Sequence, residues 1–160
     1  MKILFTDIDG VLNSLQYDRQ KSSEQGNIDE TRLPLLKRIV DETQAKIVLS
    51  SSWREHWHRD EALCDAVGKD IVALFAKYQL TIFDKTPKRP DNDRAREIGM
   101  WLGENGPIAR FAILDDIAWG WEELQPYLVR TNARIGRGLE ARHVQQAIDL
   151  LNGGEEFIKH

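Results

Sequence analysis

The chain alternates between short apolar runs and longer segments in which apolar residues recur every three or four positions. Short runs of Ile, Leu, Val and Phe bounded by polar residues predict buried strands, and they fall at residues 3–5, 46–49, 80–83, 111–114 and 127–130. The amphipathic segments predict helices, and they fall at residues 30–43, 53–67, 71–78, 119–124 and 140–151. Strands that alternate with helices predict an α/β fold, here a three-layer, doubly wound, Rossmann-like parallel sheet of about five strands.

Capping residues refine the bounds of these helices. Asp29 is placed to cap the first helix, and Gly68 is predicted to end the second. One more helix is predicted to begin after a cap at Asp91 or Asp93. It is predicted to end at Gly103 or Gly106. Residues 12–29 are polar and aperiodic, which predicts a long loop over the end of the first strand.

Composition places the chain among ordinary globular proteins. Its 160 residues are 41% hydrophobic and 30% charged, and no repeat or linker divides them, so residues 1–160 are predicted to form a single domain. The net charge of -4 argues against a general electrostatic grip on nucleic acid, although a local basic groove stays compatible with it. The single Cys64 cannot form an internal disulfide, which fits either a reducing compartment or a chain that makes no use of thiols. The N-terminal apolar run is too short for a signal peptide, and no run reaches the roughly 18 residues of a membrane span. These features predict a cytoplasmic protein.

Polar side chains follow four of the predicted strands. They are Asp7 with Asp9, the serines at 50–52, the basic segment 85–94, and Asp115 with Asp116. Each group alone has a plain structural explanation as a turn, a loop or a helix cap. In a parallel sheet, however, all four strand ends lie at one edge, where ligands bind. Neighbouring carboxylates there need a cation between them, so the pattern predicts a Mg²⁺ and phosphate site.

These features together resemble the haloacid dehalogenase (HAD) superfamily of phosphohydrolases. The sequence DIDGVL at residues 7–12 matches its first motif, Ser50 after the strand IVL matches the second, and DD after the strand FAIL matches the fourth. More narrowly, four short patterns resemble the HAD domain of Swiss-army-knife RNA-repair proteins. They are IVLSSSWR at 47–54, RAREI at 94–98 followed by WL at 101–102, ILDD at 113–116, and GL at 138–139.

The resemblance implies roles for the acidic residues. Asp7 would attack phosphorus and form an aspartyl-phosphate, while Asp9 would act as general acid and then general base. Oxygens of Asp7, Asp115 and Asp116, with the backbone carbonyl of Asp9, would hold Mg²⁺. An acid at Asp9 favours a phosphatase or phosphotransferase over the dehalogenases, which lack an acid there, and over the P-type pumps, which carry Thr.

The resemblance also implies groups that hold the phosphate. Ser50 would hydrogen-bond a phosphoryl oxygen, with Ser51 as a further substrate contact. The third motif of the superfamily is usually Lys, but here Arg94 opens the helix, and Lys88 and Arg89 precede it by a few residues. Which of these three supplies the positive charge stays open, and Lys88 is also a candidate for substrate binding.

The sequence WREHWHR follows the three serines. On a helix Trp53 and Trp57 would share one face. That face fits either packing in the core or a substrate rim on which Arg54 binds phosphate and a Trp stacks on a base. Two later tryptophans, Trp119 and Trp121, are expected to pack on the sheet.

The gaps between residues 9 and 50 and between 52 and 94 leave no room for a large cap domain. An open site suits a large substrate that itself excludes water. We therefore predict a Mg²⁺-dependent phosphoric monoester hydrolase that acts on a phosphorylated substrate such as a nucleic-acid end. The alternatives are a phosphatase for small metabolites or nucleotides, and a non-catalytic HAD-like module that binds Mg²⁺ or a partner.

Overall fold

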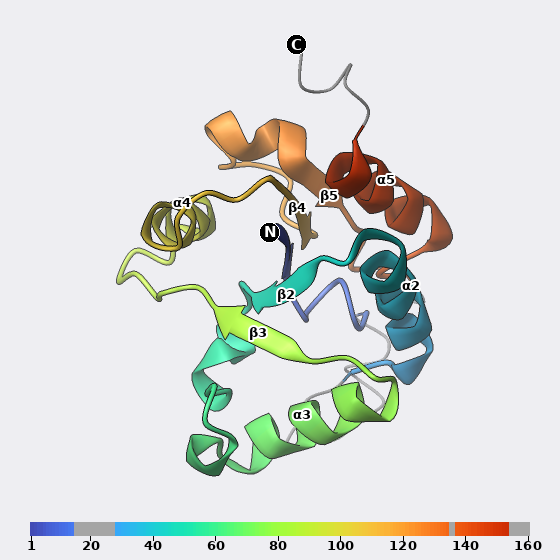
Figure 1. Ribbon diagram of the computed structural model, residues 1–160, viewed down its shortest axis with the longest axis vertical. Helices are drawn as coiled ribbons and strands as arrows, with labels where there is room; N and C mark the ends of the chain where they lie inside the picture. The colour runs from blue at the N-terminus through green and yellow to red at the C-terminus, as the bar shows by residue number, and fades with distance from the viewer. Residues whose placement is uncertain (15–27, 135–136, 154–160) are drawn as a thin grey trace.

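The computed structural model describes residues 1–14, 28–134 and 137–153. Within these residues five strands form one parallel sheet in the order β3-β2-β1-β4-β5 (Figure 1). The strands are β1 (Lys2–Thr6), β2 (Lys46–Leu49), β3 (Ile82–Lys85), β4 (Arg110–Asp115) and β5 (Leu128–Arg130). β1 is central, because it pairs with β2 on one side and with β4 on the other. The predicted five-stranded parallel sheet is confirmed.

Helices cover both faces of the sheet and make three layers. Figure 1 shows α4 on the opposite side of the sheet from α2 and α5. β1 contributes to both layers because successive side chains of a strand point to opposite faces. Leu4 lies in the apolar cluster with α2, α3 and α5, whereas Ile3 and Phe5 lie in the cluster with α4. The helices are α2 (Leu33–Thr43), α3 (Ala66–Lys77), α4 (Arg94–Glu104) and α5 (Ala141–Asn152).

Two predicted helix caps are confirmed. The Asp29 carboxylate accepts a hydrogen bond from the Thr31 N–H and begins a short 3-10 turn, η1 (Glu30–Arg32), that leads into α2. Asp93, rather than Asp91, caps α4, and its carboxylate accepts from the Arg96 N–H. Such caps satisfy backbone donors that a helix start leaves unpaired.

The predicted helix over residues 53–67 is wrong. The chain instead forms two 3-10 turns, η2 (Ser52–His56) and η3 (Glu61–Leu63), before α3 begins. The side chains of Asp60 and Asp65 each accept a backbone N–H and start a new turn, so they interrupt a continuous helix. Gly68 does not end a helix: it lies in the first turn of α3, where a Cβ would overlap the His56 carbonyl.

Three smaller predictions also need correction. β3 begins two residues later than predicted, and the helix predicted at 119–124 is a 3-10 helix, η4 (Glu122–Tyr127). Trp121 is buried as expected, but Trp119 is 78% exposed and does not pack on the sheet. The loop predicted over residues 12–29 lies mostly outside the described residues.

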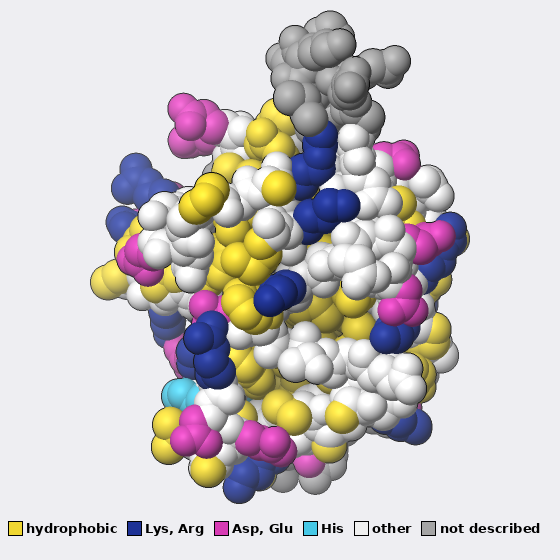
Figure 2. All heavy atoms as spheres, viewed as in Figure 1, with side chains coloured by type: hydrophobic (Ala, Val, Ile, Leu, Met, Phe, Trp, Pro, Cys, Tyr) yellow, Lys and Arg dark blue, Asp and Glu magenta, His cyan; other side chains and the backbone are white. Residues whose placement is uncertain are grey.

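The described residues contain no cap domain between β1 and β2 or between β2 and β3. Among them, no helix is long and apolar enough to cross a membrane. Basic and acidic side chains both occur on the face shown in Figure 2, in keeping with the small net charge of -4. The edge of the sheet where the strands end therefore stays uncovered by any second domain of the described chain.

Candidate active site

The sheet brings the predicted strand-end residues together. The backbone N–H of Asp7 donates to the carbonyl of Leu114 (3.0 Å), and the N–H of Ser50 donates to the carbonyl of Thr6 (3.0 Å). These bonds extend the ladder by one step beyond β1 and β2. Asp115 is the last residue of β4, beside β1. Asp7, Ser50 and Asp115 therefore occupy neighbouring positions at one edge, as the sequence predicted.

Three carboxylates form the centre of this edge. One oxygen from each of Asp7, Asp115 and Asp116 lies within 4.8 Å of the others. Burial raises the pKa of Asp7 to about 7, against the opposing effect of Arg94 and with a further contribution from Asp115. Burial and the nearby Asp115 raise the pKa of Asp116 to about 6. Carboxylates crowded in this way are relieved by a cation, and an all-oxygen donor set fits a hard ion such as Mg²⁺.

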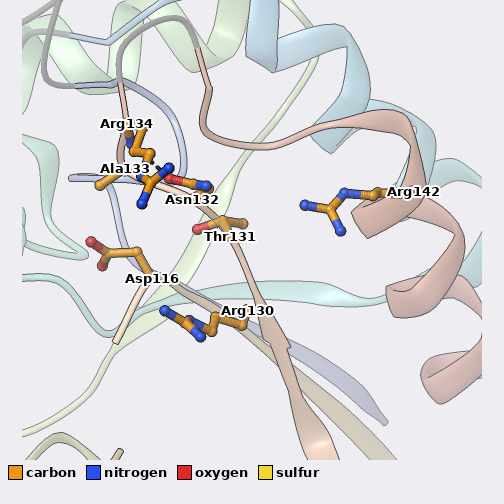
Figure 3. Close-up of a pocket in the computed structure, with 7 residues that line it drawn as sticks. All are labelled: Asp116, Arg130, Thr131, Asn132, Ala133, Arg134 and Arg142. Atoms are coloured by element: carbon orange, nitrogen blue, oxygen red, sulfur yellow. Dashed lines mark hydrogen bonds between the residues drawn. The ribbon is translucent and has the colours of Figure 1, made fainter. Parts of the chain in front are cut away.

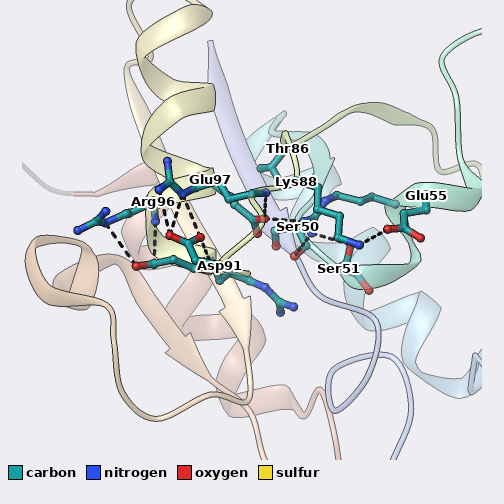
Figure 4. A network of polar contacts seen from close by, with 12 residues as sticks. Ser50, Ser51, Glu55, Thr86, Lys88, Asp91, Arg96 and Glu97 are labelled. Atoms are coloured by element: carbon teal, nitrogen blue, oxygen red, sulfur yellow. Dashed lines mark hydrogen bonds and ion pairs between the residues drawn. The ribbon is translucent and has the colours of Figure 1, made fainter.

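Arg94 is the cation at this cluster. As the first residue of α4, it places Nη1 3.0 Å from Asp7 Oδ2 and 2.7 Å from Asp115 Oδ2. The other two candidates face elsewhere. Lys88 pairs with Glu55 at the surface (Figure 4), and the side chain of Arg89 pairs with Asp91. Of the three residues that the sequence left open, Arg94 is the one that pairs with Asp7 and Asp115 among the described residues.

Ser50 and Ser51 differ in the hydrogen bonding of their hydroxyl groups. The side chain of Ser50 is fully buried, and its Oγ has no hydrogen-bond partner among the described residues. A buried hydroxyl without a partner is costly, which fits a group kept for a ligand oxygen. Ser51 Oγ instead accepts from the Trp53 N–H (3.1 Å) and caps η2.

Asp9 is exposed, and its carboxylate accepts hydrogen bonds from two side chains. The Trp53 indole N–H donates to Asp9 Oδ2 (3.0 Å), and Asn13 Nδ2 donates to Asp9 Oδ1 (3.0 Å). Asn13 is itself fixed, because its Oδ1 accepts from the Gly10 N–H (2.8 Å). Gly10 has a φ of +81°, and a Cβ there would lie 2.5 Å from Asp116 Cγ. The turn after β1 therefore packs directly against the acidic doublet.

Arg54, predicted as a substrate contact, lies beneath the site rather than at its opening. It is 4% exposed, its Nη2 is 2.7 Å from Glu97 Oε2, and its Nη1 donates to the Ser51 carbonyl (3.0 Å). Glu97 lies one turn after Arg94 on α4. The pair thus ties the serine loop to the helix that carries the cation.

Sequence reasoning did not find Asn13 or Glu97. Asn13 lies in a polar stretch where an Asn is a common turn residue, and nothing local marks it as a partner of Asp9. The one available signal for Glu97 was its position on the apolar side of α4, next to Ile98, because an acid is rarely buried without a partner.

The central β1 strand, the parallel sheet and the acidic strand ends are those of a HAD-like domain. The family profile described as the HAD domain in Swiss Army Knife RNA repair proteins matches residues 3–144, and the chain belongs to this family. A comparison with curated proteins gave no significant match.

Proposed function

We propose that the protein is a Mg²⁺-dependent phosphohydrolase that uses Asp7 as its nucleophile on a phosphomonoester. The observation that carries this proposal is the set of groups around Asp7. Its carboxylate is buried beside Asp115, Asp116 and the Arg94 guanidinium. Family membership supports the same class of chemistry.

The chain's own residues supply the nucleophile and the proton transfers of this reaction, and part of the charge stabilisation. The Asp7 carboxylate attacks phosphorus, and the bond to the leaving oxygen breaks as Asp9 donates a proton to that oxygen. Asp9 then takes a proton from water, whose oxygen attacks the aspartyl-phosphate and releases inorganic phosphate. Arg94 and Ser50 hold the phosphoryl oxygens, which suits a reaction that depends mainly on positioning and charge stabilisation.

The carboxylates of Asp7, Asp115 and Asp116, with the backbone carbonyl of Asp9, would hold Mg²⁺. Bound there, the ion supplies positive charge next to the phosphoryl oxygens. The hydrogen bonds from Trp53 and Asn13 keep the Asp9 carboxyl group in one orientation for proton transfer.

Asp7→Asn tests the nucleophile. The amide is a much poorer nucleophile of nearly the same size, so turnover of an aryl phosphate should fall by about three orders of magnitude or more. A chelator should abolish wild-type turnover, and added Mg²⁺ should restore it. Asp70→Asn, on the exposed face of α3, is the matched control. Wild-type turnover by Asp7→Asn would rule out the mechanism.

We further propose a nucleic-acid end as the substrate. The RNA-repair family supports it, as does the absence of a cap domain from the described chain. Trp119 supports it as well, because this 78% exposed indole and Arg94 line the same cavity of about 340 Å³. An exposed Trp beside a phosphate site can stack on a base.

A substrate panel tests this proposal. Oligonucleotides with a 3′- or a 5′-phosphate are compared with sugar phosphates and mononucleotides, and we expect the highest kcat/KM on an oligonucleotide. A preference of several orders of magnitude for a small metabolite would overturn the choice of substrate. Mg²⁺ binding with no turnover of any member would identify a non-catalytic module instead.

A further inference from the structure

A basic cavity adjoins the carboxylate cluster on the side of β5. It measures about 470 Å³ and shares one wall, Asp116, with the candidate metal site. Three arginines line it: Arg130 at the end of β5, Arg134 shortly after it, and Arg142 on α5. Figure 3 shows Arg142 reaching across from α5 toward Thr131, on the other side of the pocket from Asp116. Nothing in the proposed mechanism uses these arginines.

This pocket carries more positive than negative charge. All three arginines are exposed, and neither the Arg130 nor the Arg134 guanidinium forms an ion pair with any described residue. Arg142 lies 3.6 Å from a Glu140 carboxylate oxygen, but that oxygen has a closer partner in Arg137 at 3.1 Å. The pocket gathers three guanidinium groups and one carboxylate, that of Asp116, and this excess of positive charge fits an anionic ligand.

The floor of the pocket is fixed to the reactive centre. The Thr131 N–H donates to the Asp115 carbonyl (2.9 Å), and Thr131 Oγ1 donates to the Gly10 carbonyl (2.7 Å). Asn132 Oδ1 accepts from the Arg134 N–H (2.9 Å), which shapes the turn that presents this arginine. The backbone that carries Arg130 and Arg134 is therefore fixed relative to Asp115 and the turn after β1.

We propose that Arg130, Arg134 and Arg142 form a subsite for the phosphodiester that lies next to the reacting terminal phosphate of an oligonucleotide. Guanidinium groups match phosphate oxygens in geometry and charge. The cavity falls in the size range of small-ligand sites, about 300–1,000 Å³, so it has room for more than one phosphate group. This inference rests on the proposed function, because it assigns the second phosphate of that same substrate.

The first test compares two substrates that differ in the second phosphate. We measure kcat/KM for a trinucleotide with a terminal phosphomonoester and for an aryl phosphate, and take their ratio. Arg130→Ala, Arg134→Ala and Arg142→Ala should each lower this ratio by about tenfold to a hundredfold, the effect of losing one charge-assisted hydrogen bond. The matched control is Arg38→Ala, because Arg38 is exposed on α2 and pairs with Glu42. A ratio equal to that of the wild type in all three variants would overturn the subsite.

The second test measures binding without turnover. In the Asp7→Asn background, the dissociation constant of a fluorescent phosphorylated trinucleotide should rise on each arginine substitution. The dependence of binding on salt should also weaken, because fewer counterions are released from the strand. A nucleoside 3′,5′-bisphosphate is titrated in parallel. Dependence on the arginines for the bisphosphate alone would overturn the assignment to a phosphodiester.

The two tests separate this inference from the proposed function. If the wild type hydrolyses the aryl phosphate through Asp7 but the arginine substitutions change neither the ratio nor binding, the subsite alone is wrong. If no substrate is hydrolysed but trinucleotide binding still depends on the arginines, the hydrolase is wrong and the anion site stands.

Discussion

Arg94 joins two carboxylates that belong to different strand ends. A single nitrogen, Nη1, contacts both Asp7 and Asp115, so the guanidinium serves the proposed nucleophile and a candidate metal ligand together. Where a superfamily member has Lys, one ammonium group would meet the same demand as a point charge. The planar fork of Arg offers further N–H groups that are free to face a phosphoryl oxygen.

Substitution of Arg94 should therefore affect turnover more than binding. Arg94→Ala should lower kcat on an aryl phosphate by about 10²–10³, the usual effect of removing one preorganised charge stabiliser. Arg94→Lys should retain part of this activity, because the charge stays while the geometry changes. Steady-state kinetics of both variants provide the measurement. A larger loss in Lys88→Ala than in Arg94→Ala would show that the wrong cation has been assigned.

Glu97 has its effect through stability rather than chemistry. Its carboxylate is 2% exposed and pairs with Arg54, which is 4% exposed. Removing one partner leaves a buried charge uncompensated. Glu97→Gln should lower the free energy of unfolding by about 3 kcal/mol, measured by urea denaturation.

Glu55→Gln is the matched control for Glu97→Gln. Glu55 also pairs with a cation, Lys88, but both side chains of that pair are 55% exposed. Exposed pairs contribute about 0–1 kcal/mol. Equal losses in the two variants would contradict the view that the buried pair holds the serine loop to α4.

At the scale of elements, Gly68 shows how packing overrides a local signal. A Gly after an amphipathic run usually ends a helix, yet Gly68 lies inside α3 because the chain at His56 crosses it closely. Gly99 on α4 is the opposite case, since a Cβ there would meet nothing within 4 Å.

These two glycines predict opposite effects of one substitution. Gly68→Ala forces backbone to move and should destabilise the fold by about 2–3 kcal/mol. Gly99→Ala removes conformational freedom from the unfolded chain at an open helical position and should stabilise by about 0.5–1 kcal/mol. Thermal unfolding of both variants checks the signs. A stabilised Gly68→Ala protein would mean that the close approach to His56 is absent.

The elements that sequence predicts well are those whose signal is local. β2 was predicted at residues 46–49 and is found there, since a short apolar run between polar residues marks a buried strand even when its pairing partners are unknown. The helix predicted at 53–67 failed because several caps compete within it. A periodic pattern records which positions are apolar, but it does not record which turn each Asp or Ser side chain will cap.

The same division holds for the candidate site. The carboxylates and Ser50 were predicted to converge because topology alone places strand ends together. The choice among Arg94, Lys88 and Arg89 depends on which partner each long side chain contacts in the folded protein. Sequence spacing does not contain this information. The arginine pocket beside Asp116 was missed for the same reason: its members come from β5, a turn and α5.

At the scale of the whole molecule, the site opposes the stability of the fold. The pKa values of Asp7 and Asp116, about 7 and about 6, both lie above the ordinary value of 3.8. The folded, metal-free protein therefore holds protons that the unfolded chain releases. The stabilisation of the folded state that comes from these two protonated groups is complete below about pH 4, and it is lost as the pH rises toward 7. The carboxylates that would hold a cation thus lower the free energy of unfolding of the metal-free protein at neutral pH.

Asp116→Asn tests this cost directly. In the presence of a chelator at pH 8, the variant should be more stable than the wild type by about 1–2 kcal/mol, a figure that allows for the partial exposure of this side chain. The difference should shrink at pH 4, where Asp116 of the folded wild type is protonated.

Mg²⁺ should reverse the order of stability of the two proteins at pH 8, because an ion that binds the folded state stabilises it and the variant has lost a ligand. Urea denaturation at both pH values, with and without Mg²⁺, gives the four comparisons, and Asp70→Asn should show no such reversal. If metal-free Asp116→Asn is the less stable protein at pH 8, the carboxylate cluster carries no electrostatic strain, and Mg²⁺ would not be needed to relieve it.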